Sequence, residues 1–335
     1  MLKNKKINIE YVDISFLKPA TYNPRTWDKA AVAKLTESIK RFGLVDPLIV
    51  KKVKLNPRSG NKNEPLDGWG DRFAIWESRP DKEEDTFEKQ WMDIDYIIKR
   101  TLYEIKYTGY FGKSIPIFTT NWVFGHALLF GSKIGKITGD DVFVEPLSLE
   151  KNSYPALKFD LENYYWNYLQ EITARAVKCS ENKYFVQPAY GTYSGDTLGI
   201  LIGSVKLLTY IKDNPQWVKD SLTKIADAII KLYEKLFQIV SSNGPDGHVN
   251  YIGCWSGERN IAVDCDIGSM ISEETYKDIF LPSIMKIMNI VKYRIYHLDG
   301  TKQLRLLDIL LDIKEIHAIQ WAPGVEKKQL CSGCL

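Results

Sequence analysis

Short apolar segments and amphipathic segments alternate near the end of the chain. An apolar run from Tyr293 to Tyr296 leads into His297 and Asp299, residues 302–312 have apolar positions at helical spacing, and residues 316–321 form a second apolar run. This order is typical of a βαβ unit with two parallel strands. Because His297 and Asp299 are two positions apart, both side chains would project to the same side of the first strand. They would then face the crevice in which α/β proteins bind ligands. The alternative is a structural strand end, in which Asp299 only accepts hydrogen bonds from the backbone of the next loop.

The alternation of short strands and long helices extends back to about residue 91. Strands are expected at residues 114–120, 142–146, 184–190, 249–254 and 260–266, and helices at residues 91–107, 123–130, 161–179, 196–211, 214–240 and 272–291. Because no sequence repeat accompanies this alternation, it predicts a parallel α/β barrel rather than a solenoid.

Polar side chains that follow the strands of such a barrel would gather on one face. The side chains expected at this face are Asp264, Asp266, His297, Asp299 and Gln320, with Arg72, Tyr190 and Asn250 joining them. Carboxylates and an imidazole at strand ends suit acid–base chemistry or a divalent metal.

The N-terminal segment has a different pattern. It predicts strands at residues 7–12 and 45–53 and a helix at residues 28–41 that ends at Gly43. With Tyr22-Asn-Pro-Arg25 and Phe42-Gly-Leu-Val-Asp-Pro-Leu-Ile-Val50, residues 1–55 resemble the opening of the ParB/sulfiredoxin-like nuclease fold, which implies a small α+β module. The Gly-His-x-Arg-type element on which that family's activity depends is not found. Residues 56–66 are expected to be a linker, and solvated surface charge is the favoured account of the basic residues, so nucleic acid is not expected as a partner.

Composition limits the remaining function classes. The 335 residues are 44% apolar and 26% charged, which is ordinary for a globular protein. The net charge of +3 is too small to indicate binding of nucleic acid. No membrane span or signal peptide is recognised. The five cysteines are odd in number and scattered, so no disulfide framework is expected and a reducing cytoplasm is the predicted location. Cys331 and Cys334 form a CxxC pair without a second pair, and residues 325–335 are expected to be a tail.

Three segments carry a second family resemblance. Val263-Asp-Cys-Asp-Ile-Gly-Ser-Met-Ile-Ser272, Tyr296-His-Leu-Asp-Gly300 and Ala318-Ile-Gln-Trp-Ala-Pro-Gly324 are similar to the uroporphyrinogen decarboxylase superfamily, in its branch related to cobamide-dependent methyltransferases. The resemblance covers residues 67–324. It implies a TIM-type (β/α) barrel whose site lies at the carboxyl ends of the strands, and a methyltransferase-type enzyme that acts on a corrinoid or another small methyl donor.

The resemblance also implies roles for individual residues. That branch holds zinc with a His-x-Cys element, which here reads His297-Leu-Asp299, so His297 and Asp299 are the implied metal ligands. The implied catalytic residues are Asp264, Asp266, His297 and Asp299, and the implied substrate-binding residues are Arg72, Tyr190, Asn250, Gln320 and Trp321. The expected partners are a small-molecule substrate and a corrinoid protein, with no membrane.

Two departures from the family pattern leave alternatives open. The Arg-rich motif that binds the substrate carboxylates of true decarboxylases is not found, so tetrapyrrole decarboxylation is the second hypothesis. A ParB-like DNA-associated protein is the third hypothesis, and it would bind DNA in a salt-sensitive manner. In the family the barrel continues after the Pro-Gly element, whereas here only residues 325–335 follow. The barrel is therefore expected to be truncated, which would leave either an inactive chain or a homodimer that covers the gap.

Overall fold

The computed structural model describes residues 49–51, 91–110, 115–119, 125–137, 142–147, 154–181, 183–188, 191–243 and 246–322. The chain divides into two compact units, Met1–Pro116 and Ile117–Leu335. In the first unit, β1 (Ile49–Lys51) pairs antiparallel with β2 (Thr108–Tyr110), which follows α4 (Ile94–Tyr107). Strand β1 and helix α4 confirm two predicted elements. The elements predicted at residues 7–12 and 28–41, the linker and the tail lie outside the described residues.

The second unit contains the predicted βαβ unit. Strand β10 (Tyr293–Asp299) leads through η7 (Lys302–Leu306) and α11 (Leu307–Leu311) to β11 (Ala318–Ala322). Both strands run parallel to each other and to β9 (Asn260–Val263), in the order β11-β10-β9. A second parallel pair joins β3 (Ile117–Phe118) to β6 (Phe185–Val186). Closure of these strands into a barrel stays a prediction.

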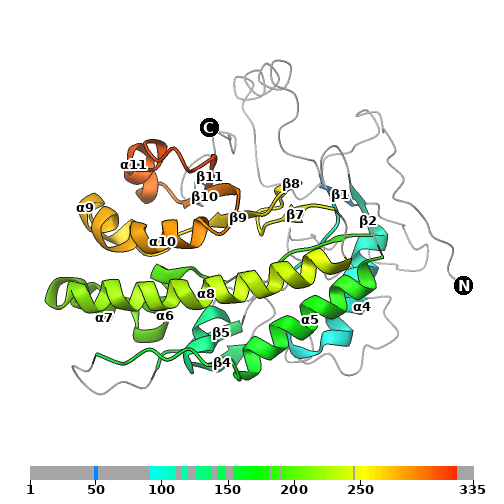
Figure 1. Ribbon diagram of the computed structural model, residues 1–335, viewed down its shortest axis with the longest axis horizontal. Coiled ribbons are helices and arrows are strands. Elements are labelled where there is room, and N and C mark those ends of the chain that lie inside the picture. Colours follow the sequence, from blue (N-terminus) through cyan, green and yellow to red (C-terminus); the bar gives the residue numbers. More distant parts are fainter. Residues whose placement is uncertain are drawn as a thin grey trace, which may run out of the picture. The chain divides into compact units, whose positions relative to one another are not determined.

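The second unit contains several helices. They are η4 (Gly125–Phe130), α5 (Tyr164–Ser180), α6 (Ser194–Ile202), α7 (Ser204–Asp213), α8 (Pro215–Asn243), η5 (Asp266–Met270), α9 (Glu273–Thr275), the π-helix η6 (Tyr276–Phe280) and α10 (Leu281–Met288). Five of them, α5, α6, α7, η6 and α10, pack against α8, the longest. Helix α8 packs against α5 on one side and α10 on the other (Figure 1). It begins at Pro215, as predicted, because proline suits the first turn of a helix.

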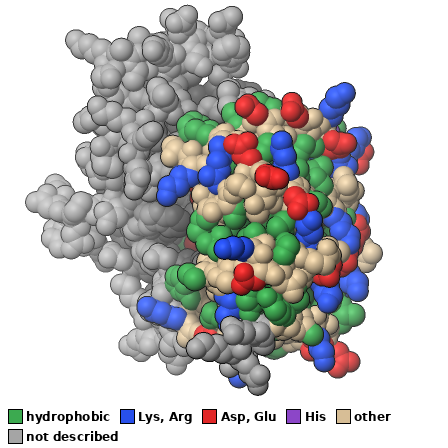
Figure 2. Space-filling model, turned by 90° about the vertical axis from the view of Figure 1, so that its left-hand side faces the viewer, with side chains coloured by type: hydrophobic (Ala, Val, Ile, Leu, Met, Phe, Trp, Pro, Cys, Tyr) green, Lys and Arg blue, Asp and Glu red, His purple; other side chains and the backbone are tan. Residues whose placement is uncertain are grey.

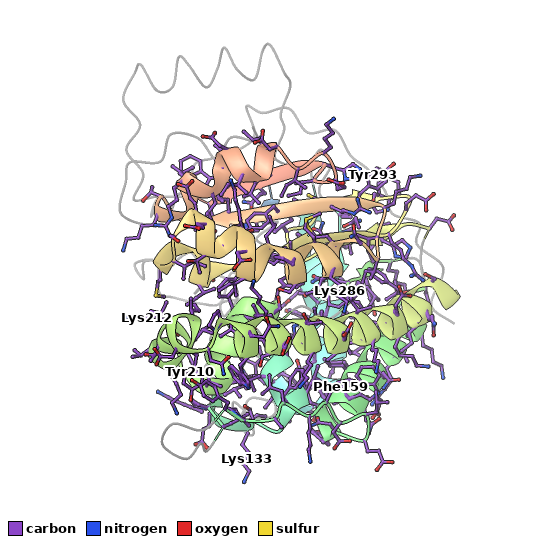
Figure 3. The ribbon with its side chains drawn as sticks, turned by 60° about the vertical axis from the view of Figure 1, so that its left-hand side comes forward. Lys133, Phe159, Tyr210, Lys212, Lys286 and Tyr293 are labelled. Carbon is purple, nitrogen blue, oxygen red and sulfur yellow. The ribbon has the colours of Figure 1, made fainter. Side chains whose placement is uncertain are left out.

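The buried face of α8 explains this packing. Leu222, Ile225, Ile229, Leu232 and Leu236 are spaced three or four residues apart, and each is fully buried. Burying one such side chain stabilises the fold by about 1.5–3 kcal/mol. On the outer surface, Lys286 of α10 lies next to α8 (Figure 3), where its Nζ is 2.6 Å from Asp227 Oδ1. Basic and acidic side chains are interspersed on the face shown in Figure 2. None of the described helices is long and apolar enough to cross a membrane.

Two predicted elements were wrong. The single helix expected at residues 196–211 is two helices, α6 and α7, because Gly203 adopts a φ of +87° between them. The strand expected at residues 249–254 is an antiparallel hairpin of β7 (His248–Val249) and β8 (Trp255–Ser256). Asn250 forms its turn, with Oδ1 accepting from Cys254 N at 3.2 Å, and Gly253 supplies a φ of +83°. A further antiparallel pair, β4 (Lys133–Ile137) with β5 (Val142–Glu145), precedes α5.

The three tyrosines in the first turns of α5 differ in burial. Tyr165 and Tyr168 lie in the core, whereas Tyr164 is 66% exposed. Tyr164 is at the first position of the helix, where its side chain points away from the packed face.

Candidate functional site

The carboxyl ends of β9, β10 and β11 meet at one edge of the sheet. His297 of β10 is directly paired with Gln320 of β11, and Tyr296 is paired with Val263 of β9. This register places Asp264, the residue after β9, next to His297. The predicted convergence of polar groups from three strands is therefore present at this edge.

Alternation along the strands decides which side chains share a face of the sheet. His297 and Gln320 lie on one face with Asp299, and Asp264 follows Ala262 on the same face. Trp321 is paired with Leu298 on the opposite face, where its Nε1 donates to Gly300 O at 3.3 Å. Among the predicted substrate-binding residues, the structure therefore brings Gln320 to His297 and places Trp321 on the other side.

His297 is held in one orientation by its neighbours. Its Nδ1 is hydrogen-bonded to the side-chain amide of Gln320. The ring of Tyr251 packs edge-on to the imidazole, with ring centroids 5.9 Å apart. Tyr251 Oη also donates to Asp264 Oδ2 at 3.1 Å. This arrangement holds the imidazole ring of His297 in one orientation, and an imidazole can act as a base near neutral pH.

Tyr251 also lines a small pocket of mixed polar and apolar character. The walls of this pocket include Gln187, Tyr193, Tyr233, Asn250, Tyr251 and Asn260, and it has room for on the order of one water molecule. Tyr193 Oη donates to Ala262 O and lies 3.3 Å from Tyr233 Oη. Burial raises the pKa of both phenols well above the usual range, so they act as neutral donors. The predicted residue Asn250 lies here, with its Nδ2 donating to Asn260 Oδ1 at 2.7 Å.

Asp196, in the first turn of α6, is a site residue that the sequence did not reveal. Its Oδ2 accepts from Asp266 N at 2.9 Å and its Oδ1 accepts from Ile267 N at 2.8 Å. It therefore fixes the turn that follows β9. Burial, with the charges of Asp264 and Asp266, raises the pKa of Asp196 to about 8. The Ser-Gly-Asp sequence that opens α6 was the only signal, and it was interpreted as a helix start.

Asp266 and Asp299 complete the acidic part of the site. Partial burial raises the pKa of Asp266, and the charge of Asp299 adds to this effect, while His297 and Gln303 oppose it. Gln303 Nε2 donates to Asp266 Oδ1 at 3.4 Å. The carboxylates of the site are thus close enough to destabilise one another's charged forms.

His126 of η4 is a second residue that the sequence did not reveal. It is fully buried against the rings of Tyr193 and Tyr233, and its Nδ1 donates to Thr192 O. Burial lowers the pKa of His126 to about 4. Gly191 allows this packing, since a Cβ there would lie 2.8 Å from the imidazole Cδ2. No sequence motif surrounds His126, and its role depends on long-range packing.

The described residues do not complete a metal site. No three His, Cys, Asp or Glu side chains among them are arranged to hold a metal ion. His297 and Asp299, the predicted zinc ligands, share a face of β10 but gain no third ligand there. Cys265 is fully buried, and burial raises the pKa of its thiol well above the usual range. Arg72, Tyr190, Cys331 and Cys334 lie outside the described residues.

Comparison with known proteins adds two likenesses. A family model described as the ParB N-terminal domain matches residues 1–59, which confirms the resemblance predicted for the N-terminal segment. No curated protein matches the chain. Among solved structures, a methyltransferase from Methanosarcina mazei is 13% identical with a TM-score of 0.47, over 65% of this chain and 60% of that chain. The chain thus spans 60% of that structure's length. A likeness at this level carries no argument about activity, and membership of the uroporphyrinogen decarboxylase superfamily stays a prediction.

Proposed function

We propose that this chain is a methyltransferase-type enzyme whose active site lies at the carboxyl edge of β9, β10 and β11. The observation that carries the proposal is the meeting of His297, Gln320 and Asp264 from three neighbouring parallel strands, next to Tyr251, which also lines a small pocket. Ligand sites of α/β proteins lie at such strand ends. The methyl-transfer chemistry comes from the sequence resemblance of residues 67–324.

In this proposal His297 is the general base. Its Nε2 takes the proton of the acceptor while the acceptor's lone pair forms the bond to the methyl carbon, and the donor keeps the electron pair of the broken bond. Gln320 orients the imidazole ring, and the charge of Asp264 stabilises the imidazolium that forms. A corrinoid is the proposed donor substrate, carried by a corrinoid protein or free.

Zinc is not needed for these steps. If His297 and Asp299 hold zinc, the other ligands come from outside the described residues, and the metal would supply an anionic acceptor. Tetrapyrrole decarboxylation is less well supported, because a substrate with several carboxylates would meet Asp196, Asp264, Asp266 and Asp299 at this edge.

The experiment that tests the proposal is methyl transfer from methylcobalamin to a thiol, followed under anaerobic conditions by the visible spectrum of the cobalamin. The chain should accelerate the loss of methylcobalamin. Asp264→Asn should slow this reaction about tenfold or more, because the imidazolium loses its stabilising charge. Asp308→Asn, at an exposed carboxylate of α11, is the matched control and should keep the wild-type rate. Equal rates for the two variants would contradict the proposal.

A second proposal concerns the N-terminal segment alone. The ParB N-terminal domain match over residues 1–59 supports an association with DNA. Binding of duplex DNA that weakens steeply as salt rises would support it. No binding of duplex DNA by the chain at low salt would rule out this second proposal.

A further inference from the structure

The pocket that Tyr251 lines is enclosed by parts of the second unit that are far apart in the sequence. Its walls come from the end of β6, from β7 and its turn, from β9, from α8 and from Tyr193, which precedes α6. The residues that line it are all uncharged. Because an ion buried there would have no opposite charge beside it, the pocket suits a neutral molecule.

Gln187, the residue after β6, lines the pocket with an amide group that has no partner. Its backbone N donates to Phe118 O at 3.0 Å, whereas its side chain forms no hydrogen bond within the part of the chain that the structure describes. Gln187 is only 4% exposed. An amide group can donate two hydrogen bonds and accept two, and buried polar groups are normally satisfied. The amide of Gln187 therefore calls for a small hydrogen-bonding molecule in the pocket.

Tyr233 of α8 offers a complementary acceptor on another wall of the same pocket. Tyr193 Oη donates its single hydrogen to Ala262 O, so the 3.3 Å hydrogen bond between the two phenols uses the hydrogen of Tyr233. The lone pairs of Tyr233 Oη are then available to a further donor. The asparagines of the pocket are already engaged with each other, since Asn250 Nδ2 donates to Asn260 Oδ1 at 2.7 Å.

We infer that the pocket binds one internal water molecule, which accepts a hydrogen bond from the amide of Gln187 and donates one to Tyr233 Oη. The pocket has room for about one water, and a buried water typically makes two to four such bonds. An apolar atom of similar size would leave both groups unsatisfied. The water joins β6 to α8 beneath Tyr251, the residue that contacts His297. The inference concerns binding alone and does not depend on methyl transfer.

The direct test is a crystal structure of the full chain at a resolution that shows ordered waters. We expect one water within hydrogen-bond distance of both the side chain of Gln187 and Tyr233 Oη. In a crystal of Gln187→Met, which fills nearly the same space but has no amide, this water should be lost. A pocket without density, or an amide of Gln187 that bonds to protein atoms instead, would overturn the inference.

A double-mutant cycle tests the same bridge in solution. Gln187→Met and Tyr233→Phe each remove one partner of the water, and each should raise the equilibrium constant of unfolding in urea about fivefold or more. Because the second substitution removes a bond to a water that has already lost its other partner, the double variant should show less than the product of the two single effects. Gln238→Met, at an exposed position of α8, is the matched control and should leave the constant unchanged.

Single effects that simply multiply in the double variant would contradict the bridge, because the two residues would then act independently. Circular dichroism verifies that each variant is folded, and the wild-type crystal tests the inference even if a variant does not fold. Each of these results leaves methyl transfer to be judged by its own assay.

Discussion

Replacing Asp196 by Asn should change how the stability of the protein depends on pH. The Asp196 carboxyl has a pKa of about 8 in the folded chain, compared with an ordinary value of 3.8. An unfolded chain therefore loses this proton near pH 4, whereas the folded chain keeps it until near pH 8. The stabilising effect of Asp196 is fully present below pH 4 and is lost as pH rises toward 8.

The magnitude follows from this difference in pKa. Each pH unit between the two pKa values costs about 1.4 kcal/mol, so wild-type stability should fall by about 4 kcal/mol between pH 5 and pH 8 through Asp196 alone. Asn does not titrate, but it keeps only one of the two acceptors that bind Asp266 N and Ile267 N. The lost bond should cost about 1–3 kcal/mol at every pH. Asp196→Asn should thus be less stable than wild type at low pH and more stable at pH 8.

Urea unfolding at pH 5, 6.5 and 8, followed by tryptophan fluorescence, measures this difference. Other titrating groups act on both proteins and largely cancel when the two are compared. The Asp308→Asn variant is the control, and its difference from wild type should not change with pH. A stability difference between Asp196→Asn and wild type that is the same at all three pH values would refute the reasoning.

Two further predictions concern stability. Burial lowers the pKa of His126 to about 4 from the ordinary 6.5, so the contribution of His126 to stability is present above pH 6.5 and is lost as pH falls. Between pH 7 and pH 4 the free energy of unfolding of wild type should therefore fall by about 3 kcal/mol more than that of His126→Phe. Equal falls for the two proteins in urea titrations would contradict this. Gly203→Ala should lower the free energy of unfolding by about 1–2 kcal/mol, because its φ of +87° strains any residue with a Cβ. The control is Gly199→Ala within α6, which places a Cβ at an ordinary 3.6 Å from Leu207 Cδ2 and should raise the free energy of unfolding by about 0.5–1 kcal/mol. Thermal melts in which Gly203→Ala is the more stable of the two variants would contradict the argument from backbone strain.

The sequence predicted the parts of the fold that depend on local signals. Pro215 marks the start of α8, and Ser272 caps α9, with its Oγ accepting from Thr275 N at 3.1 Å. The apolar runs that end in Asp264 and in His297 became parallel strands with their polar groups at one edge. In each case the signal lies within a few residues of the feature that it predicts.

The features that the sequence did not predict depend on distant residues or on alternation. Asp196 reaches the turn after β9 from 70 residues away, and His126 is buried by residues far along the chain. Gly203 was available as a helix-breaking signal, but glycine within a helical pattern is ambiguous until its φ is known. Gln320 and Trp321 are neighbours in one strand, so alternation alone forbids both from facing His297.

The central claim is that the edge of the sheet that carries His297, and not the opposite edge, performs methyl transfer. The most direct measurement compares the rate of methyl transfer from methylcobalamin in His297→Ala with that in His317→Ala. His317 is an exposed histidine at the other end of the same pair of strands, where it packs edge-on to Tyr293. Tyr293 is labelled in Figure 3. The account predicts a fall of about a hundredfold or more for His297→Ala and the wild-type rate for His317→Ala. Equal rates in the two variants, or no methyl transfer by the wild-type chain, would contradict it.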